Sequence, residues 1–187
     1  KLIELVKDFK EQNLKVVIWT NFIRVLKLIF YELAAHGIYS KYIYGGVPLI
    51  VDDSMDETED RETIRKEFVD PNSGLDVLLA NPAACSEAIS LHKTCQNAIY
   101  YDLSFNCAQY LQSLDRIHRV GGSEDKKVEY YFLHYNNSID QQIMDNLEIK
   151  KERMYALIEK DYPIYSLDMF EDDDTEINVY KKIIGLN

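Results

Sequence analysis

The sequence predicts an α/β fold in which a mostly parallel sheet carries helices on both faces. Short apolar runs alternate along the chain with longer segments whose apolar residues recur at helical spacing. Strands and helices that alternate in this way are typical of a parallel sheet with crossover helices. The predicted helices span residues 2–12, 22–35, 59–68, 107–120 and 138–160, and the strands span residues 15–19, 39–44, 75–80, 97–102 and 127–134.

The first helix and strand follow directly from their patterns. Apolar residues of segment 2–12 recur every three or four positions, as on one face of a helix. Segment 15–19 reads KVVIW, an apolar run typical of a strand that is buried on both faces. Thr20 or Asn21 can then cap the helix of residues 22–35, because both side chains accept hydrogen bonds from free backbone N–H groups.

Glycine and proline mark the boundaries of the next elements. The His36-Gly37 pair is a usual helix stop, and a Gly-Gly pair closes the strand of residues 39–44. An acidic stretch leads into the helix of residues 59–68, which stops at Asp70-Pro71. The strands of residues 75–80 and 97–102 are again apolar runs.

The last three elements complete the alternation. Residues 107–120 have helical character, residues 127–134 form the final strand, and Ser138 begins a long helix with apolar residues at helical spacing. Ligands of parallel sheets bind where strands end at their carboxyl edge. The loops after Trp19, Ala80 and Asp102 are therefore the expected site, and Asp102 fits an Asx turn and a site role equally well.

Composition limits the class of protein. The chain has 187 residues, of which 47% are hydrophobic, enough for one domain with a full core and a small appendage. Its formal net charge of −11 argues against strong nonspecific nucleic-acid binding by a surface that is basic all over. No apolar run is long enough for a membrane span, so no membrane partner is expected. Cys85, Cys95 and Cys107 match no zinc spacing and are expected to be reduced and buried.

The most informative segment is residues 112–122, which read QSLDRIHRVGG. Arg116 and Arg119 are three positions apart and are expected on one face of a helix, with Gln112 one turn earlier. Guanidinium groups offer a fixed charge and a planar fork of donors that suits phosphate oxygens. Two of them at this spacing can meet one polyphosphate.

This segment resembles the sixth motif of the Swi/Snf-type DNA translocases of helicase superfamily two, Q-A-x-D-R-x-H-R-x-G-Q. Upstream, residues 101–106 (YDLSFN) are similar to the family's Y-D-x-x-W-N, and residues 16–22 lie at the fourth motif. The fifth motif, A-G-G-x-G-x-N-L in the family, is looser here. Residues 84–91 read ACSEAISL, so Cys85, Ser86 and Ala88 replace its glycines.

The resemblance implies the second, C-terminal motor lobe of a helicase or translocase. The expected fold is a three-layer RecA-like domain over residues 1–160, with residues 161–187 as an acidic appendage of uncertain order. In that family two such lobes enclose ATP, and the N-terminal lobe holds most of the ATP and Mg²⁺. This chain has neither a G-x-x-x-x-G-K-[ST] loop nor a D-E-x-H sequence, so we expect no hydrolysis by the chain alone.

Particular residues take roles by their match to the motifs. Arg119 corresponds to the arginine finger, and Arg116 would assist on the same phosphate or order the loop. Gln112 and Glu87 correspond to further ATP-binding residues. Contacts to double-stranded DNA are expected from Thr20 and Asn21 at a helix N-terminus and from Ser86 and Ser90 in the fifth motif. The expected partners are thus the N-terminal lobe of the same protein and duplex DNA.

Two other functions fit the sequence less well. A degenerate lobe that only regulates or binds a partner is favoured by the altered fifth motif and the acidity, but it has no need of two arginines in the sixth. An unrelated nucleotide-binding domain would require a glycine-rich phosphate loop, for which Gly45-Gly46 is weak support. Without large insertions, the chain is expected to be a bacterial or phage-type cytoplasmic protein with no part in chromatin remodelling, or nuclear if eukaryotic.

Overall fold

The sheet has five parallel strands in a computed structural model that describes residues 1–48, 59–84, 91–118 and 127–159. Their order across the sheet is β2-β3-β1-β4-β5, and each of the four neighbouring pairs is parallel. This arrangement confirms the predicted α/β class. The strands are β1 (Val16–Trp19), β2 (Ser40–Ile43), β3 (Val77–Ala80), β4 (Asn97–Tyr100) and β5 (Glu129–Phe132).

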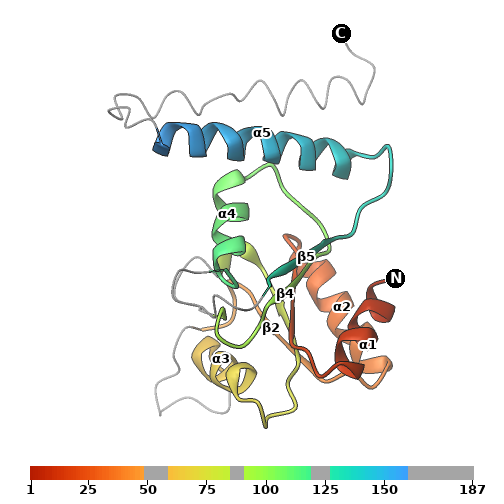
Figure 1. Cartoon of the computed structure of the whole chain (residues 1–187). Helices are drawn as coiled ribbons and strands as arrows, with labels where there is room; N and C mark the ends of the chain where they lie inside the picture. Colours follow the sequence, from red (N-terminus) through yellow and green to blue (C-terminus); the bar gives the residue numbers. More distant parts are fainter. Residues whose placement is uncertain (49–58, 85–90, 119–126, 160–187) are drawn as a thin grey trace.

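Helices cover both faces of this sheet (Figure 1). The helices are α1 (Leu2–Glu11), α2 (Ile23–Ala35), α3 (Arg61–Val69), α4 (Cys107–Asp115) and α5 (Ile139–Glu159), with a short 3₁₀ helix at Pro82–Ala84. Successive side chains of a strand point to opposite faces. Val16 and Ile18 therefore pack in one core with α1 and α2, whereas Val17 and Trp19 pack in the other with α3, α4 and α5.

Burial follows the position of each strand in the sheet. Every residue of the central strands β1, β3 and β4 is buried, as expected for strands covered on both faces, whereas β5 at the edge is half-buried throughout.

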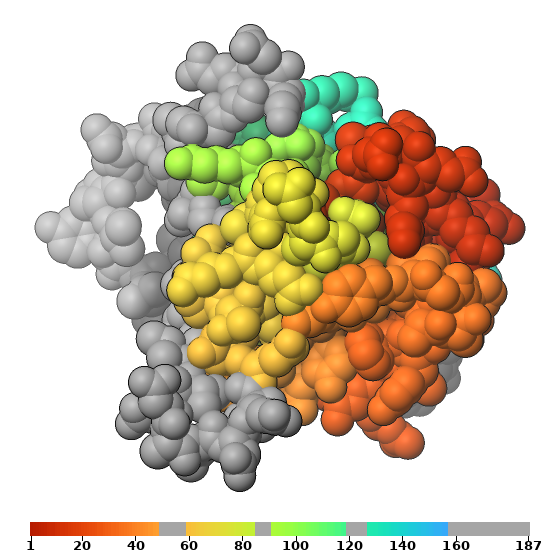
Figure 2. Space-filling view, turned by 90° about the horizontal axis from the view of Figure 1, so that it is seen from below, coloured from red at the N-terminus to blue at the C-terminus, as the bar shows by residue number. Residues whose placement is uncertain are grey.

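Seen from below, the N-terminal segment (red and orange) lies beside the yellow segment that contains α3 (Figure 2).

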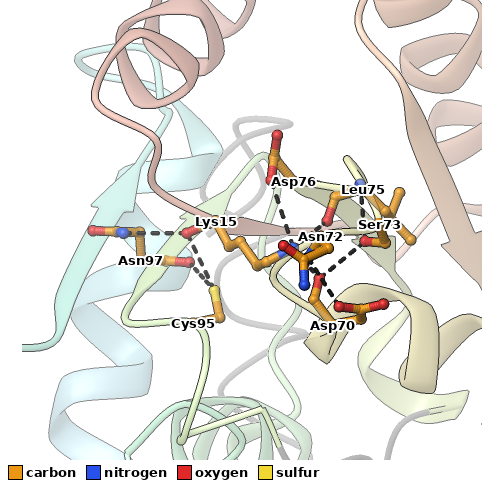
Figure 3. Close-up of polar contacts among 8 residues, drawn as sticks. All are labelled: Lys15, Asp70, Asn72, Ser73, Leu75, Asp76, Cys95 and Asn97. Carbon is orange, nitrogen blue, oxygen red and sulfur yellow. Dashed lines mark hydrogen bonds and ion pairs between the residues drawn. The ribbon is translucent and has the colours of Figure 1, made fainter.

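Lys15 joins three loops at the amino ends of the strands (Figure 3). Its ammonium donates to the carbonyls of Leu75 (2.7 Å) and Asp70 (3.2 Å), and lies 3.5 Å from the Asp76 carboxylate. Its own carbonyl accepts from the Asn97 side-chain Nδ2 at 3.2 Å. A lysine that ends the first connection thus fixes the loops that precede β3 and β4.

The C-terminus of α4 differs from the prediction. The sequence predicts a helix to residue 120 that carries Arg116 and Arg119 on one face, but α4 ends at Asp115 and Arg116 is its C-cap. The last turn tightens, with the Arg116 and Ile117 amides bonded to the carbonyls of Ser113 and Leu114. The Arg116 carbonyl accepts instead from the Leu91 amide at 3.0 Å. This link across the chain ends the helix, and Arg119 lies outside the described residues.

The predicted cap of α2 is also wrong. Phe22 is the N-cap, and no side chain makes a capping hydrogen bond there. Thr20 and Asn21 lie just before that position, and their polar groups bind Asp102, after the end of β4, instead.

Candidate functional site

A carboxylate at the end of β4 collects donors from the end of β1. The Asp102 carboxylate accepts hydrogen bonds from the Thr20 hydroxyl, from the Asn21 amide N–H (2.7 Å) and from the Asn21 side-chain Nδ2 (2.9 Å). β1 and β4 are neighbours, and the Tyr101 amide still bonds to the Trp19 carbonyl beyond the strands. The sheet therefore brings these side chains together at its carboxyl edge.

Asn81 extends this arrangement to a third strand. It follows β3 directly, and its Nδ2 donates to the carbonyls of Thr20 (3.2 Å) and Asn21 (2.8 Å). Its Oδ1 accepts from the Ala83 amide at 3.1 Å, at the start of the 3₁₀ helix. We call Thr20, Asn21, Asn81 and Asp102 the strand-end cluster, which joins three adjacent strands at the edge where parallel sheets bind ligands.

The members of the cluster differ in access to solvent. Thr20 is fully buried and Asn81 is only 7% exposed, whereas Asn21 is partly exposed. Asn21 also borders a small pocket between the strand ends and α4. This pocket is lined by Asn21, Pro82, Tyr100, Leu103, Ser104, Tyr110 and Ser113. A ligand at this edge would meet Asn21 before Thr20.

Tyrosines pack next to this edge of the sheet. The buried Tyr100 hydroxyl lies 2.6 Å from that of Ser113, and its ring stacks on Phe132 at 4.9 Å. Burial raises the pKa of Tyr100 well above its usual value, and raises the pKa of Tyr130 to about 12. Both phenols are therefore neutral near pH 7, and Tyr100 is buried, so its ring packs in the core and cannot serve as a platform on which bases stack.

The predicted ATP-side residues lie on the second half of α4 and at its C-cap. The helix begins after the strand-end loop at Asn106, whose side chain caps it, and finishes at Arg116. Arg116 is 8% exposed, and its carbonyl is bonded to Leu91, whose chain leads into β4. Gln112 lies one turn earlier and is exposed. The nine residues of α4 extend about 13 Å along the helix axis.

The structure thus describes four of the residues predicted for the site. Thr20 and Asn21 come together with Asp102, and Gln112 and Arg116 share the second half of α4. Arg119, Glu87, Ser86 and Ser90 lie outside the described residues. Their roles, and the DNA contacts of Thr20 and Asn21, stay predictions.

Two polar residues of this edge, Asn81 and Arg61, were not identified from the sequence. Asn81 had a signal, because it stands directly after an apolar strand. Arg61 had none, since its partners are backbone carbonyls, which no sequence pattern reveals. Within the described ranges, no group of three or more His, Cys, Asp or Glu side chains could hold a metal ion. The described helices likewise include none that is long and apolar enough to cross a membrane.

Comparison with known proteins decides the family. Residues 1–121 match the model of the helicase conserved C-terminal domain. The chain belongs to this family. A solved structure, the C-terminal part of the Fun30 ATPase domain, matches this helicase lobe with a TM-score of 0.65 at 25% identity, over 78% of this chain and 43% of that one. The fold is accordingly RecA-like.

Similar curated proteins place the helicase lobe among the Swi/Snf type. It is 32% identical over 137 residues to SNF2 domain-containing protein CLASSY 3 of Arabidopsis thaliana, a match that covers 71% of this chain and 9% of that protein. It is 28% identical over 147 residues to the SWI/SNF-related matrix-associated actin-dependent regulator of chromatin subfamily A member 1 of Homo sapiens, covering 79% and 13%. It is therefore a C-terminal lobe of the Swi/Snf helicase type.

These relatives also bear on source and extent. Both are eukaryotic, so the prediction of a bacterial or phage-type cytoplasmic protein finds no support. The lobe spans only about a tenth of the length of either relative.

Proposed function

We propose that this lobe is the second motor domain of an ATP-dependent DNA translocase or helicase, and that it supplies an arginine finger and part of the DNA-binding surface. One observation carries the proposal. The segment that reads as the sixth motif begins on α4 and leaves it at Arg116, where a backbone bond to Leu91 fixes the chain against the core. A finger that follows three residues later starts from a rigid base.

The arginines divide the work in this proposal. Arg119 reaches the γ-phosphate across the cleft between the lobes, because a guanidinium there stabilises the charge that develops in phosphoryl transfer. Arg116 is nearly buried, and this burial favours the role of ordering the segment beyond α4 over direct phosphate contact. Gln112 and Glu87 add polar contacts to the nucleotide. ATP with Mg²⁺, bound mainly by the N-terminal lobe, supplies the phosphoryl group whose transfer to water drives the motor.

The DNA surface lies at the carboxyl edge of the sheet. Asn21, Ser86 and Ser90 meet the phosphate backbone, and partial exposure of Asn21 beside the pocket supports its part. The Thr20 hydroxyl is buried against Asp102, so Thr20 contributes to this surface by holding its neighbour in place. Asn21 on the DNA side and Ser113 of α4, next to Gln112, line the same pocket, so α4 can transmit movement between the two sets of residues.

A regulatory role is the second candidate. It is favoured by Cys85, Ser86 and Ala88, which replace the glycines of the fifth motif, and by the net charge of −11. In either case we place the protein in the nucleus, because the relatives above are eukaryotic and one is named as a regulator of chromatin.

The test is ATP hydrolysis by the full-length protein with duplex DNA, single-stranded DNA or RNA. We expect hydrolysis that duplex DNA stimulates most strongly, together with displacement of a third strand from a triplex. Hydrolysis that only RNA stimulates would show that the protein acts on RNA and not on DNA. A folded full-length protein that binds DNA or a protein partner without hydrolysis would favour the regulatory role.

A further inference from the structure

Arg61, the first residue of α3, donates to three backbone carbonyls from two separate connections. Its Nε donates to Val47 (2.7 Å) and its Nη2 to Gly45 (3.3 Å), both in the turn after β2. Its Nη1 donates to Ala84 (3.0 Å), the last residue of the 3₁₀ helix after β3. One guanidinium therefore links the segments that leave two adjacent strands at the carboxyl edge.

The base of this side chain is itself fixed. The Arg61 amide donates to the Pro48 carbonyl at 2.9 Å, and the Asp60 side chain caps α3 by accepting from the Thr63 amide at 2.6 Å. The turn that Arg61 binds is closed by a bond from the Val47 amide to the Tyr44 carbonyl at 2.9 Å. Within it, a Cβ added to Gly46 would lie 2.5 Å from the Tyr44 ring, so the turn packs closely.

Ala84 is also the point from which the chain proceeds toward Leu91. Arg61 binds the carbonyl of Ala84, and the Leu91 amide donates to the carbonyl of Arg116 at the end of α4. The chain therefore departs from a residue that α3 holds and returns to a residue that α4 holds. These two contacts connect the DNA-side edge of the sheet with the ATP-side end of α4.

We propose that Arg61 is a positioning residue that couples the DNA-side edge to ATP turnover by fixing Ala84 and the turn of residues 45–47. It acts through these carbonyls and touches neither DNA nor nucleotide. The planar fork with several donors is what three carbonyls in different directions require, and a lysine ammonium cannot replace it. The inference rests on the proposed motor function.

The experiment compares Arg61→Ala, Arg61→Lys and Arg65→Ala in the full-length protein. Arg65 is the matched control, because it lies one turn later on α3 and pairs with Glu62 of the same helix (2.8 and 2.7 Å). We expect Arg61→Ala to lower DNA-stimulated turnover by about tenfold to a hundredfold. ATP affinity should stay at the wild-type value, Arg61→Lys should fall between, and Arg65→Ala should match wild type.

Hydrogen exchange gives a readout that is independent of activity. The amides of Val47 and Ala84 are bonded to the carbonyls of Tyr44 and Asn81, and both should exchange faster in Arg61→Ala but not in Arg65→Ala. DNA-stimulated turnover of Arg61→Ala equal to that of Arg65→Ala would overturn the proposal, as would unchanged exchange at the two amides. If Arg61→Ala does not fold, Arg61→Lys decides by the same criteria.

Failure of the motor function itself has a different signature. Wild-type protein without ATP hydrolysis would remove the proposed function. Faster exchange in Arg61→Ala would then still support Arg61 as the residue that positions this edge, and unchanged exchange would reject it.

Discussion

The Thr20 hydroxyl donates a hydrogen bond to the Asp102 carboxylate across the carboxyl ends of β1 and β4. Thr20 is fully buried, so the bond is made away from solvent. A charged acceptor strengthens such a bond, and Asn21 adds two further donors to the same carboxylate. Replacement Thr20→Val keeps the shape and removes the donor. We expect it to lower the free energy of unfolding by about 1.5–3 kcal/mol, measured by urea denaturation of this chain.

Thr63→Val is the matched control for that substitution. Thr63 is exposed on α3, so its replacement should change stability by less than about 0.5 kcal/mol. Equal effects of the two variants would show that the Thr20–Asp102 bond contributes nothing.

Lys15 provides a test of the network at the opposite edge of the sheet. Lys15→Met retains an apolar side chain next to Phe68 but leaves the carbonyls of Leu75 and Asp70 without this donor. We expect a loss of about 2 kcal/mol in the free energy of unfolding. Lys7→Met on the exposed side of α1 is the control and should be nearly neutral. A Lys15→Met protein as stable as that control would show that the Lys15 contacts drawn in Figure 3 do not stabilise the fold.

Cys95 carries a prediction about reactivity and pH. Burial raises the pKa of its thiol from 9.0 to about 12, so iodoacetamide at pH 8.5 should label Cys95 in denaturant but not in the native chain. Between these two pKa values the folded state binds more protons, and stability should fall as pH rises from about 9 to 12. The decline should be smaller in Cys95→Ala. Rapid native labelling would show that the thiol is accessible.

Glu67 titrates with the opposite sign. Burial favours its neutral form, but hydrogen bonds from Lys41 and Tyr39 outweigh burial and lower the pKa of Glu67 below 4.5. Its contribution is therefore present above pH 4.5 and is lost as pH falls through the lower, folded-state value. Glu67→Gln should cost about 0.5–1 kcal/mol at pH 7 and nothing near pH 2, as measured by denaturation at each pH. A cost that does not depend on pH would contradict this explanation.

The sequence predicted the strands of this fold better than its polar contacts. β1, β3 and β4 are apolar runs because both of their faces are covered, and that burial leaves a direct mark on composition. The end of α4 was wrong because it depends on a backbone bond from Leu91, which lies far away in the chain. The cap predicted from Thr20 and Asn21 was wrong because these residues donate to Asp102. Asp102 is distant in the sequence and lies beside them only because β1 and β4 are neighbours in the sheet.

The candidate site was predicted in part. The loops after Trp19, Ala80 and Asp102 were singled out because parallel strands end there, and the structure joins them in the strand-end cluster. Asn81 follows from the same rule. Arg61 does not follow from it. Its partners are three backbone carbonyls, and because every residue has a carbonyl, the sequence does not show which ones an arginine will bind.

Turnover of Arg119→Ala in the full-length protein tests the central claim most directly. The finger assignment predicts that kcat for DNA-stimulated hydrolysis falls by about 10³–10⁵ while ATP affinity is retained. Arg119→Lys should be nearly as inactive, because the charge remains without the fork. Arg153→Ala, an exposed arginine on α5, should behave as wild type. Turnover of Arg119→Ala within a few-fold of wild type would contradict the assignment of this lobe as the source of the finger.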